Sequence, residues 1–168
     1  MPSDATLPLP HEPVLRAVGH AADRLGIEAY AVGGAVRDAF LGRPTTDLDF
    51  VTVGKKTGIK LAKAAAKKLG GATVHVYENF GTAAIRLPEG EGAAAGGPLV
   101  LEFVAARKES YRKDSRKPLV EEGTLEDDQR RRDFTINAHA VALNAERFGN
   151  LLDPFGGVID LVGQKLRT

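Results

Sequence analysis

The sequence predicts one α/β domain of the α+β type, with a mixed β-sheet and flanking helices. Three observations carry this prediction. The chain has 168 residues, 43% of them hydrophobic, which is enough for one core of ordinary size. Short alternating or apolar segments typical of strands are interspersed with longer segments of helical spacing. Some strand segments follow one another directly, which favours a mixed sheet over a purely parallel one.

The first part of the chain is predicted to alternate between helices and strands. Residues 1–10 are proline-rich and do not resemble a signal peptide, so we expect a flexible leader ahead of a domain over 11–168. Apolar side chains recur at helical spacing over 12–25, and Gly26 ends that helix. The elements expected next are strands at 27–32 and 46–53 and helices at 35–41 and 57–69.

The second part is predicted to consist mainly of strands. These are expected at 73–78, 82–87 and 99–106, followed by a closing pair at 136–143 and 150–153. Residues 88–98 are rich in Gly and Ala and predict a flexible connection. A helix is expected at 124–132, with Thr124 as N-cap and Asp127 in its first turn, and a last one at 158–164.

Composition limits the possible functions. The chain lacks cysteine, which excludes disulfides and thiolate metal sites and fits a cytoplasmic protein. No apolar run approaches the ~20 residues of a membrane helix, so we expect no membrane partner. The net charge of +1 is weak for binding nucleic acid by overall charge. Basic residues nevertheless gather in one segment, either as a solvated loop or as a contact for RNA or phosphate: Arg107, Lys108, Arg112, Lys113, Arg116 and Lys117.

The strongest chemical signal is the pair Asp47 and Asp49 in a predicted strand. Side chains alternate faces along a strand, so both carboxylates should lie on one face, with Leu48 and Phe50 on the other. Two carboxylates repel unless a cation lies between them, and oxygen ligands suit Mg²⁺. The alternative is two exposed acids at a sheet edge.

Glu102 is the only charged residue in an apolar strand segment. A buried, unpaired carboxylate is costly, so Glu102 should face water, a cation or a metal. If its strand lies beside that of Asp47, Glu102 can complete a site of three carboxylates for two metal ions. Otherwise it points to solvent from an edge strand.

A pair of glycines, Gly33 and Gly34, lies between a predicted strand and a predicted helix. Glycine lets the backbone approach a ligand closely, and a helix N-terminus favours anions. Arg37 and Arg43 can add charge-assisted bonds to phosphate, whereas Asp38 can simply pair with a nearby arginine. A plain turn is the alternative for this segment.

The other polar cluster is the run 130–138, which reads Arg-Arg-Arg-Asp-Phe-Thr-Ile-Asn-Ala. Its arginines suit a helix C-terminus, while Asp133 and Asn137 can hydrogen-bond a ribose hydroxyl. His139 lies in an apolar stretch and is expected to be a packed histidine, and His75 is expected on a strand face. With four histidines and no cysteine, a zinc site is not expected.

Three motifs together resemble the class II tRNA nucleotidyltransferase and bacterial poly(A) polymerase family. Gly-Gly-Ala-Val-Arg-Asp at 33–38, followed by Asp-Leu-Asp at 47–49, resembles its first signature. Residues 124–128, leading into Arg-Arg-Asp-Phe-Thr-Ile-Asn-Ala at 131–138, resemble the second. Asp-Pro-Phe-Gly-Gly at 153–157 is similar to the segment that closes the head domain. The resemblance covers about residues 27 to 168.

The resemblance implies a polymerase-β-like head with about five strands in a mixed sheet. It implies Mg²⁺, as two ions with Mn²⁺ as an alternative, held by Asp47, Asp49 and Glu102. It also implies ATP or CTP as substrate and an RNA 3′ end, that of tRNA, as acceptor. The residues implied to bind the nucleotide are Gly33, Gly34, Arg37, Asp38, Thr82, Arg132, Asp133 and Asn137. The basic segment, with Arg107, Arg112, Lys113 and Arg116, corresponds to a mobile loop that can serve nucleotide or RNA.

The sequence also departs from the family pattern. The family continues into a helical neck with a Glu-Asp-x-x-Arg element, and neither neck nor body follows here, so we expect either a truncated chain or a head that works with a helical partner. His139 stands where an apolar residue is usual, and the 88–98 segment is long. The first hypothesis is CCA addition to tRNA, with a poly(A) polymerase head as the alternative. An inactive nucleotide-binding module and a small-substrate nucleotidyltransferase are hypotheses from other classes.

Overall fold

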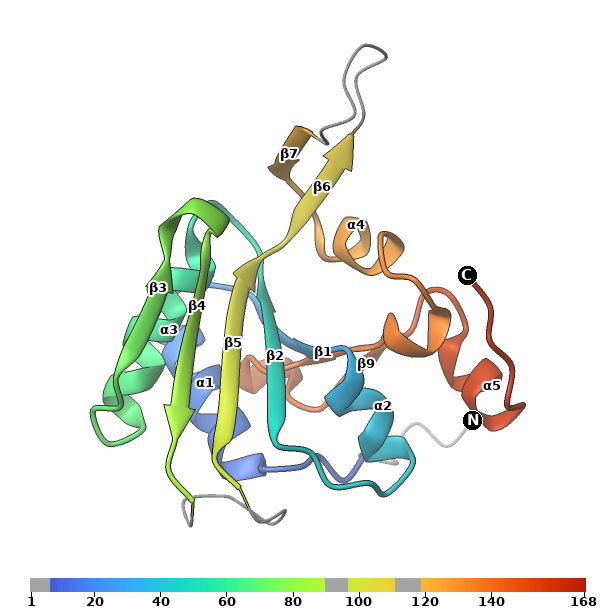
Figure 1. The fold of residues 1–168 in the computed structure, drawn as a ribbon, viewed down its shortest axis with the longest axis horizontal. Helices are drawn as coiled ribbons and strands as arrows, with labels where there is room; N and C mark the ends of the chain where they lie inside the picture. Colours follow the sequence, from blue (N-terminus) through green and yellow to red (C-terminus); the bar gives the residue numbers. More distant parts are fainter. Residues whose placement is uncertain (1–6, 90–96, 111–118) are drawn as a thin grey trace.

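A mixed sheet of seven strands forms the centre of the molecule in the computed structural model, which describes residues 7–89, 97–110 and 119–168 (Figure 1). Its spatial order is β3 (Val74–Tyr77), β4 (Thr82–Leu87), β5 (Leu99–Ala105), β2 (Asp47–Thr52), β1 (Ala29–Val32), β8 (Ala140–Ala142) and β9 (Leu151–Leu152). Strands β2 and β5 are parallel, and the other neighbours are antiparallel. The predicted mixed sheet is confirmed, and it is wider than the five strands that the resemblance implied.

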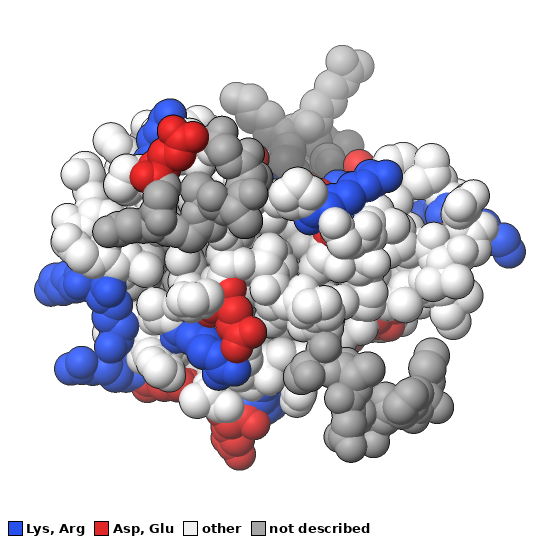
Figure 2. All heavy atoms as spheres, turned by 90° about the horizontal axis from the view of Figure 1, so that it is seen from below, with Lys and Arg blue, Asp and Glu red and all other residues white. Residues whose placement is uncertain are grey.

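Two long helices cover one face of this sheet. They are α1 (Glu12–Leu25) and α3 (Thr57–Lys68), both at the predicted positions. Their apolar stripes pack on the inward side chains of the sheet, where Phe50 and Phe103 stack with ring centroids 4.7 Å apart. The other side of α3 is rich in lysine, and basic side chains gather at the α3 side of the molecule in Figure 2. Leu7 and Leu9 of the expected leader pack against the same core.

The opposite face of the sheet is covered only in part. Helix α4 (Leu125–Arg130) lies on this face, where a second, smaller core includes Tyr30, Val51 and Leu125. Helix α2 (Gly34–Phe40) follows β1 and buries its apolar side chains in the larger core. Thr124 caps α4, as its sequence predicted, and it does so in a reciprocal capping box with Asp127. The alternate residues His75, Tyr77 and Arg86 remain exposed on β3 and β4. This open half of the face leaves room for a site.

Two segments differ from the sequence-based expectation. The basic segment begins as β6 (Arg107–Ser110), which pairs with β7 (Leu119–Glu122) in a ribbon that projects from the body (Figure 1). Its side chains are largely polar, so no apolar alternation marked it as a strand. The strand expected at 136–143 is shorter, because the chain first forms a 3₁₀ turn, η2 (Thr135–Asn137), and β8 begins only at Ala140.

The remaining elements are short. The 3₁₀ turns η1 (Glu78–Phe80) and η3 (Ala145–Arg147) connect strands, and α5 (Gly157–Val162) begins where Asp153 accepts hydrogen bonds from two backbone amides. The connection expected at 88–98 falls largely outside the described residues. Among the helices of the described segments, none is long and apolar enough to span a membrane.

Candidate active site

The register of β2 and β5 brings two of the predicted carboxylates together. Asp49 lies directly opposite Glu102, while Asp47 lies one step along the same face, opposite Val100. Leu48 and Phe50 point into the core and are fully buried, as the strand alternation predicted. Asp49 is half-buried and Glu102 is exposed. The strand of Glu102 is therefore a direct neighbour of the Asp-x-Asp strand, at the center of the sheet rather than at its edge.

A negative charge on Asp49 is unfavourable in this position. Burial, followed by the negative charge of Glu102, raises the pKa of Asp49 to about 6, and the nearby Arg132 guanidinium offsets only part of this rise. A carboxyl group in such a place either holds a proton or requires a cation beside it. The pair of Asp49 and Glu102 thus has the oxygen donors that suit a hard divalent cation, and its negative charge is only partly neutralised by the chain.

Asp47 stands slightly apart from this pair. Its carboxylate is exposed and accepts a hydrogen bond from the Thr46 hydroxyl at 3.2 Å. As the side chains lie, the described residues contain no group of three acidic, histidine or cysteine side chains placed to hold a metal ion. The donor set thus fits a divalent cation through Asp49 and Glu102, with Asp47 within reach of the same face.

The glycine turn lies immediately beside the carboxylates. Gly33 has φ of 74° and ψ of −143°, a conformation that a residue with a side chain rarely adopts. A Cβ atom added to Gly33 would lie 3.3 Å from Nη1 of Arg132 and 3.4 Å from Oδ2 of Asp49. Gly34 begins α2, as expected for a strand–turn–helix segment. Glycine at 33 therefore lets the backbone pass between an arginine and a carboxylate.

A hydrogen-bonded network joins the two sequence motifs. The Arg37 guanidinium donates to Asn137 Oδ1 at 2.9 Å and to Asp38 Oδ1 at 2.9 Å. Asn137 in turn donates to Asp133 at 3.4 Å, and Asp133 accepts from the amide of Phe134. Residues 100 positions apart in sequence are thereby fixed next to α2. Asp38 pairs with an arginine, as one of its two interpretations predicted.

A pocket of about 230 Å³ opens over the carboxylates. Its lining includes Asp49, Glu102, Val32, Tyr77, Thr82, Ala84, Val104, Arg107, Arg131 and Arg132. Within the described part of the chain, Nε of Arg107 and Nε of Arg132 are buried without a hydrogen-bond partner. Buried donors that lack partners are costly, so these two groups are suited to an anionic ligand. The pocket therefore combines carboxylates for a cation with arginines for an anion.

Sequence reasoning missed the group that positions the arginines. Asp128 on α4 is fully buried and accepts from Arg131 at 2.6 Å and from Arg132 at 3.0 Å. The available signal was the spacing of these residues, because positions three and four apart share one helix face. The exposed aromatic ring of Tyr77 in the pocket was also missed, since a strand residue that faces a pocket has no special sequence pattern.

The other predicted residues fall into four groups. Arg107 and Thr82 line the pocket, whereas Arg112, Lys113 and Arg116 lie outside the described residues. Arg43 and His75 are exposed. His139 is fully buried against the Phe40 ring, at 5.5 Å between centroids, so its interpretation as a packed histidine is confirmed.

Comparison with known proteins matches residues 29–167 to the poly A polymerase head domain. The chain belongs to this family. It is 43% identical over 142 residues to the A-adding tRNA nucleotidyltransferase of Aquifex aeolicus (strain VF5), covering 84% of this chain and 16% of that protein. It is 41% identical over 140 residues to the CC-adding tRNA nucleotidyltransferase of Deinococcus radiodurans, covering 83% of this chain and 34% of that protein.

Solved structures agree with this family assignment. A tRNA nucleotidyltransferase complexed with a primer tRNA and an incoming ATP analog superposes with a TM-score of 0.71 at 40% identity, over 90% of this chain and 38% of that one. A CCA-adding enzyme with ATP gives a TM-score of 0.74 at 32% identity, over 94% of this chain and 33% of that one. The chain therefore spans between about a sixth and two fifths of the length of these relatives.

Proposed function

We propose that this chain is the catalytic head of a metal-dependent nucleotidyltransferase that extends the 3′ end of RNA without a template. The observation that carries the proposal is the direct pairing of Asp49 with Glu102 in a pocket that also holds Arg132. Carboxylates that need a cation, and guanidinium groups that still have donor atoms without a hydrogen bond, are the two requirements of a site for a metal-bound triphosphate.

The proposed reaction joins a nucleoside monophosphate to RNA. The oxygen of the RNA 3′-hydroxyl attacks the α-phosphorus of ATP or CTP, the bond to the leaving pyrophosphate breaks, and the hydroxyl proton is lost. Two Mg²⁺ ions, or Mn²⁺ in their place, would be held by Asp47, Asp49 and Glu102, would lower the pKa of the hydroxyl and would stabilise the leaving group. Asp47 would join its two neighbours by giving up the hydrogen bond from the Thr46 hydroxyl.

The residues that contact the nucleotide are proposed from their position around the carboxylates. Gly33 and Arg132 adjoin Asp49 directly, and the Arg37–Asn137 network holds α2 against η2. In the proposed site, the nucleotide is bound by Gly33, Gly34, Arg37, Asp38, Thr82, Arg132, Asp133 and Asn137. Arg107, whose Nε atom is buried without a hydrogen-bond partner among the described residues, is proposed to contact phosphate.

We propose tRNA as the RNA substrate, with CMP or AMP as the transferred group. The similar proteins are named A-adding, CC-adding and CCA-adding enzymes, which favours tRNA over a poly(A) substrate. Residues 11–168 would form the head domain, and a tRNA substrate would place the protein in the cytoplasm.

A second candidate is a head that binds nucleotide but is active only with further helical domains or a helical partner chain. This second candidate is favoured because the chain spans only 16% of the Aquifex protein and 34% of the Deinococcus protein. Base selection and tRNA binding would then depend on regions that correspond to the remaining two thirds or more of these relatives.

The test is nucleotide incorporation into tRNA that lacks its 3′ end, with Mg²⁺ and each labelled triphosphate in turn. The proposal expects incorporation that disappears in the Asp47→Ala/Asp49→Ala variant. Incorporation that is unchanged in this variant would contradict it. Magnesium-dependent ATP or CTP binding without incorporation would favour the second candidate.

A further inference from the structure

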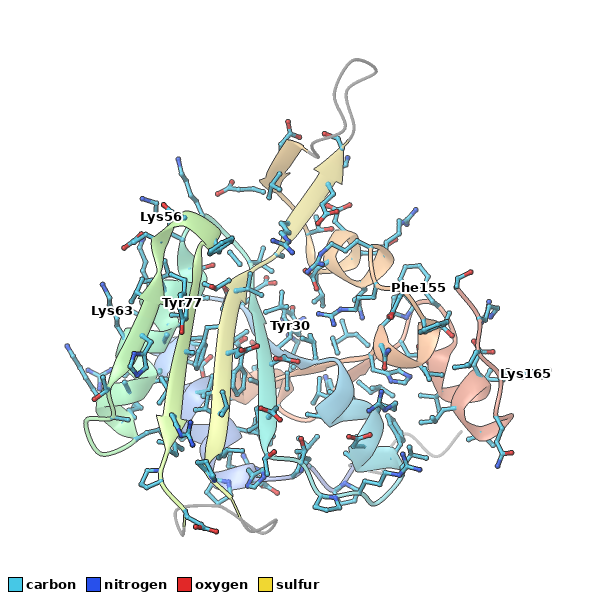
Figure 3. All side chains as sticks on the ribbon, viewed as in Figure 1. Tyr30, Lys56, Lys63, Tyr77, Phe155 and Lys165 are labelled. Carbon is cyan, nitrogen blue, oxygen red and sulfur yellow. The ribbon has the colours of Figure 1, made fainter. Side chains whose placement is uncertain are left out.

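Tyr77 lies on the open half of the sheet, at one wall of the carboxylate pocket. It ends β3, it is one of the residues that line the pocket, and 52% of the residue is exposed. Figure 3 shows it over the β3–β4 side of the sheet, across the pocket from α4. Exposed aromatic rings are expected at surfaces that bind flat or apolar groups, since burying such a ring against a ligand is favourable.

The two walls of the pocket differ in chemistry. Arg131 and Arg132 follow α4 on one side, and the glycine turn lies beside Arg132. On the other side, Tyr77, Thr82 and Ala84 present uncharged groups. The carboxylates of Asp49 and Glu102 lie between the walls. The charged wall suits the triphosphate of one reactant, which leaves the uncharged wall for the sugar and base of the other.

The register of the sheet places Tyr77 about one nucleotide's length from the strand that carries Glu102. Tyr77 pairs with Thr82, which pairs with Val104, two residues beyond Glu102 on the same face. Two strand spacings separate Tyr77 from β5, or roughly 10 Å. One nucleotide can bridge this distance, with its 3′-hydroxyl at the carboxylates and its base over the tyrosine ring.

We propose that Tyr77 stacks on the 3′-terminal base of the RNA acceptor. This inference rests on the proposed function, because it assigns the second substrate of that same site. Stacking of a base on an aromatic ring tolerates every base, so Tyr77 would hold the acceptor end in place as that end changes from one nucleotide to the next.

The same hairpin contains a matched control. Phe80 is 75% exposed in η1, three residues after Tyr77, but it is not part of the pocket lining. Phe80→Thr therefore removes an exposed ring near the site without removing the proposed stacking surface. Tyr77→Thr keeps a residue that is favourable in strands, and Tyr77→Phe keeps the ring.

The experiment compares two RNA hairpins with a single-stranded 3′ end, one normal and one with an abasic 3′-terminal nucleotide. Their dissociation constants are measured by fluorescence anisotropy through a 5′ label, so no catalysis is needed. The wild-type chain, Tyr77→Phe and Phe80→Thr are expected to bind the normal RNA at least about fivefold more tightly than the abasic one. Tyr77→Thr is expected to bind both equally, at the weaker value, with ATP affinity unchanged.

Several results would overturn the inference. They are a wild-type chain that does not distinguish the two RNAs, a Tyr77→Thr variant that keeps the preference, or equal loss of the preference in Phe80→Thr. A change in ATP affinity in place of RNA affinity would assign the ring to the incoming nucleotide instead. Absent incorporation with any RNA would count against the proposed function alone, because the affinity comparison still decides the role of Tyr77.

Discussion

Two acidic regions of this molecule lie close together, but the negative charge of only one of them is neutralised by neighbouring arginines. On α4, the fully buried Asp128 receives hydrogen bonds from Arg131 and Arg132, at 2.6 and 3.0 Å. On the sheet, Asp49 faces Glu102, and its pKa is raised by burial and by that second negative charge. The first carboxylate has its charge neutralised by the chain itself, whereas the second does not.

This difference indicates a structural role for Asp128 and favours a functional role for Asp49 and Glu102. A buried carboxylate with two guanidinium partners fixes the position of those partners, so Asp128 holds Arg132 next to Gly33 and Asp49. A pair of carboxylates without sufficient cations is destabilising by itself, and such strain is typical of sites that bind a cation from solution. We therefore propose that one acidic residue positions the pocket and that two others bind a cation within it.

The largest expected effect comes from the unneutralised pair. Glu102→Gln removes a negative oxygen ligand with little change in size, so nucleotide incorporation should fall about 100-fold or more. The matched control is Glu126→Gln, since Glu126 is exposed and forms only a surface ion pair with Arg130. Steady-state incorporation rates for both variants provide the measurement, and similar rates in the two would remove Glu102 from the site.

The neutralised region should show the largest effect on stability. Asp128→Asn leaves two guanidinium groups without their carboxylate, and breaking a buried ion pair of this kind should cost about 3 kcal/mol in the free energy of unfolding. Urea denaturation measures this cost, with Glu126→Gln again as the control, which should change by no more than about 0.5 kcal/mol. A loss under about 1 kcal/mol for Asp128→Asn would mean that α4 does not depend on this cluster.

The glycine between the two regions is expected to show a smaller effect. Gly33→Ala forces a side chain into a backbone with φ of 74° and ψ of −143°, and its Cβ meets both Arg132 and Asp49. We expect a cost of about 1–3 kcal/mol together with loss of ATP affinity. Gly26→Ala is the control, because Gly26 has φ of 63° but has no other atom within 4 Å of an added Cβ. It should lose about 1 kcal/mol of stability and keep its ATP affinity.

The smallest expected change is a gain in stability. The pKa of Asp49 is raised in the folded state to about 6, so the folded protein binds this proton more tightly than the unfolded chain does. The stabilising contribution of the protonated group is fully present below pH 4 and is lost as pH rises through about 6. Without metal at pH 8, the free energy of unfolding of Asp49→Asn should therefore be higher than that of the wild type by about 1–2 kcal/mol, after allowance for solvent screening.

The matching measurement is urea denaturation with EDTA at pH 4 and at pH 8. The gain from Asp49→Asn should shrink at the lower pH, where the wild-type carboxyl group is protonated. An equal gain at both values would show that burial of a charge at Asp49 is not its cause.

Much of the fold could be predicted because apolar spacing encodes it directly. Residues 12–25 and 57–69 have helical stripes, and both helices lie where expected. The ribbon of β6 and β7 could not be predicted, because its polar side chains give no alternation between an apolar and a polar face. The strand expected at 136–143 was too long, since Thr135 hydrogen-bonds to Asp160 and turns the chain before β8 begins.

The site shows the same division. Asp47 and Asp49 could be found from their alternation, and Glu102 from its isolation in an apolar strand. The parallel pairing of β2 with β5, which places Glu102 opposite Asp49, depends on the whole sheet and not on any local pattern. The role of Asp128 was hidden as well, because an acidic residue in a helix is usually solvent-exposed.

The most direct test of the account is Mn²⁺ binding, followed by the EPR signal of the free ion at pH 8. Wild-type protein, Asp49→Asn and Glu126→Gln are titrated under the same conditions. The wild type and Glu126→Gln are expected to bind Mn²⁺, and Asp49→Asn is expected to bind it at least about tenfold more weakly, although this variant is expected to be the more stable protein without metal. Equal Mn²⁺ affinity in all three proteins would contradict the claim that the Asp49–Glu102 pair is a metal site.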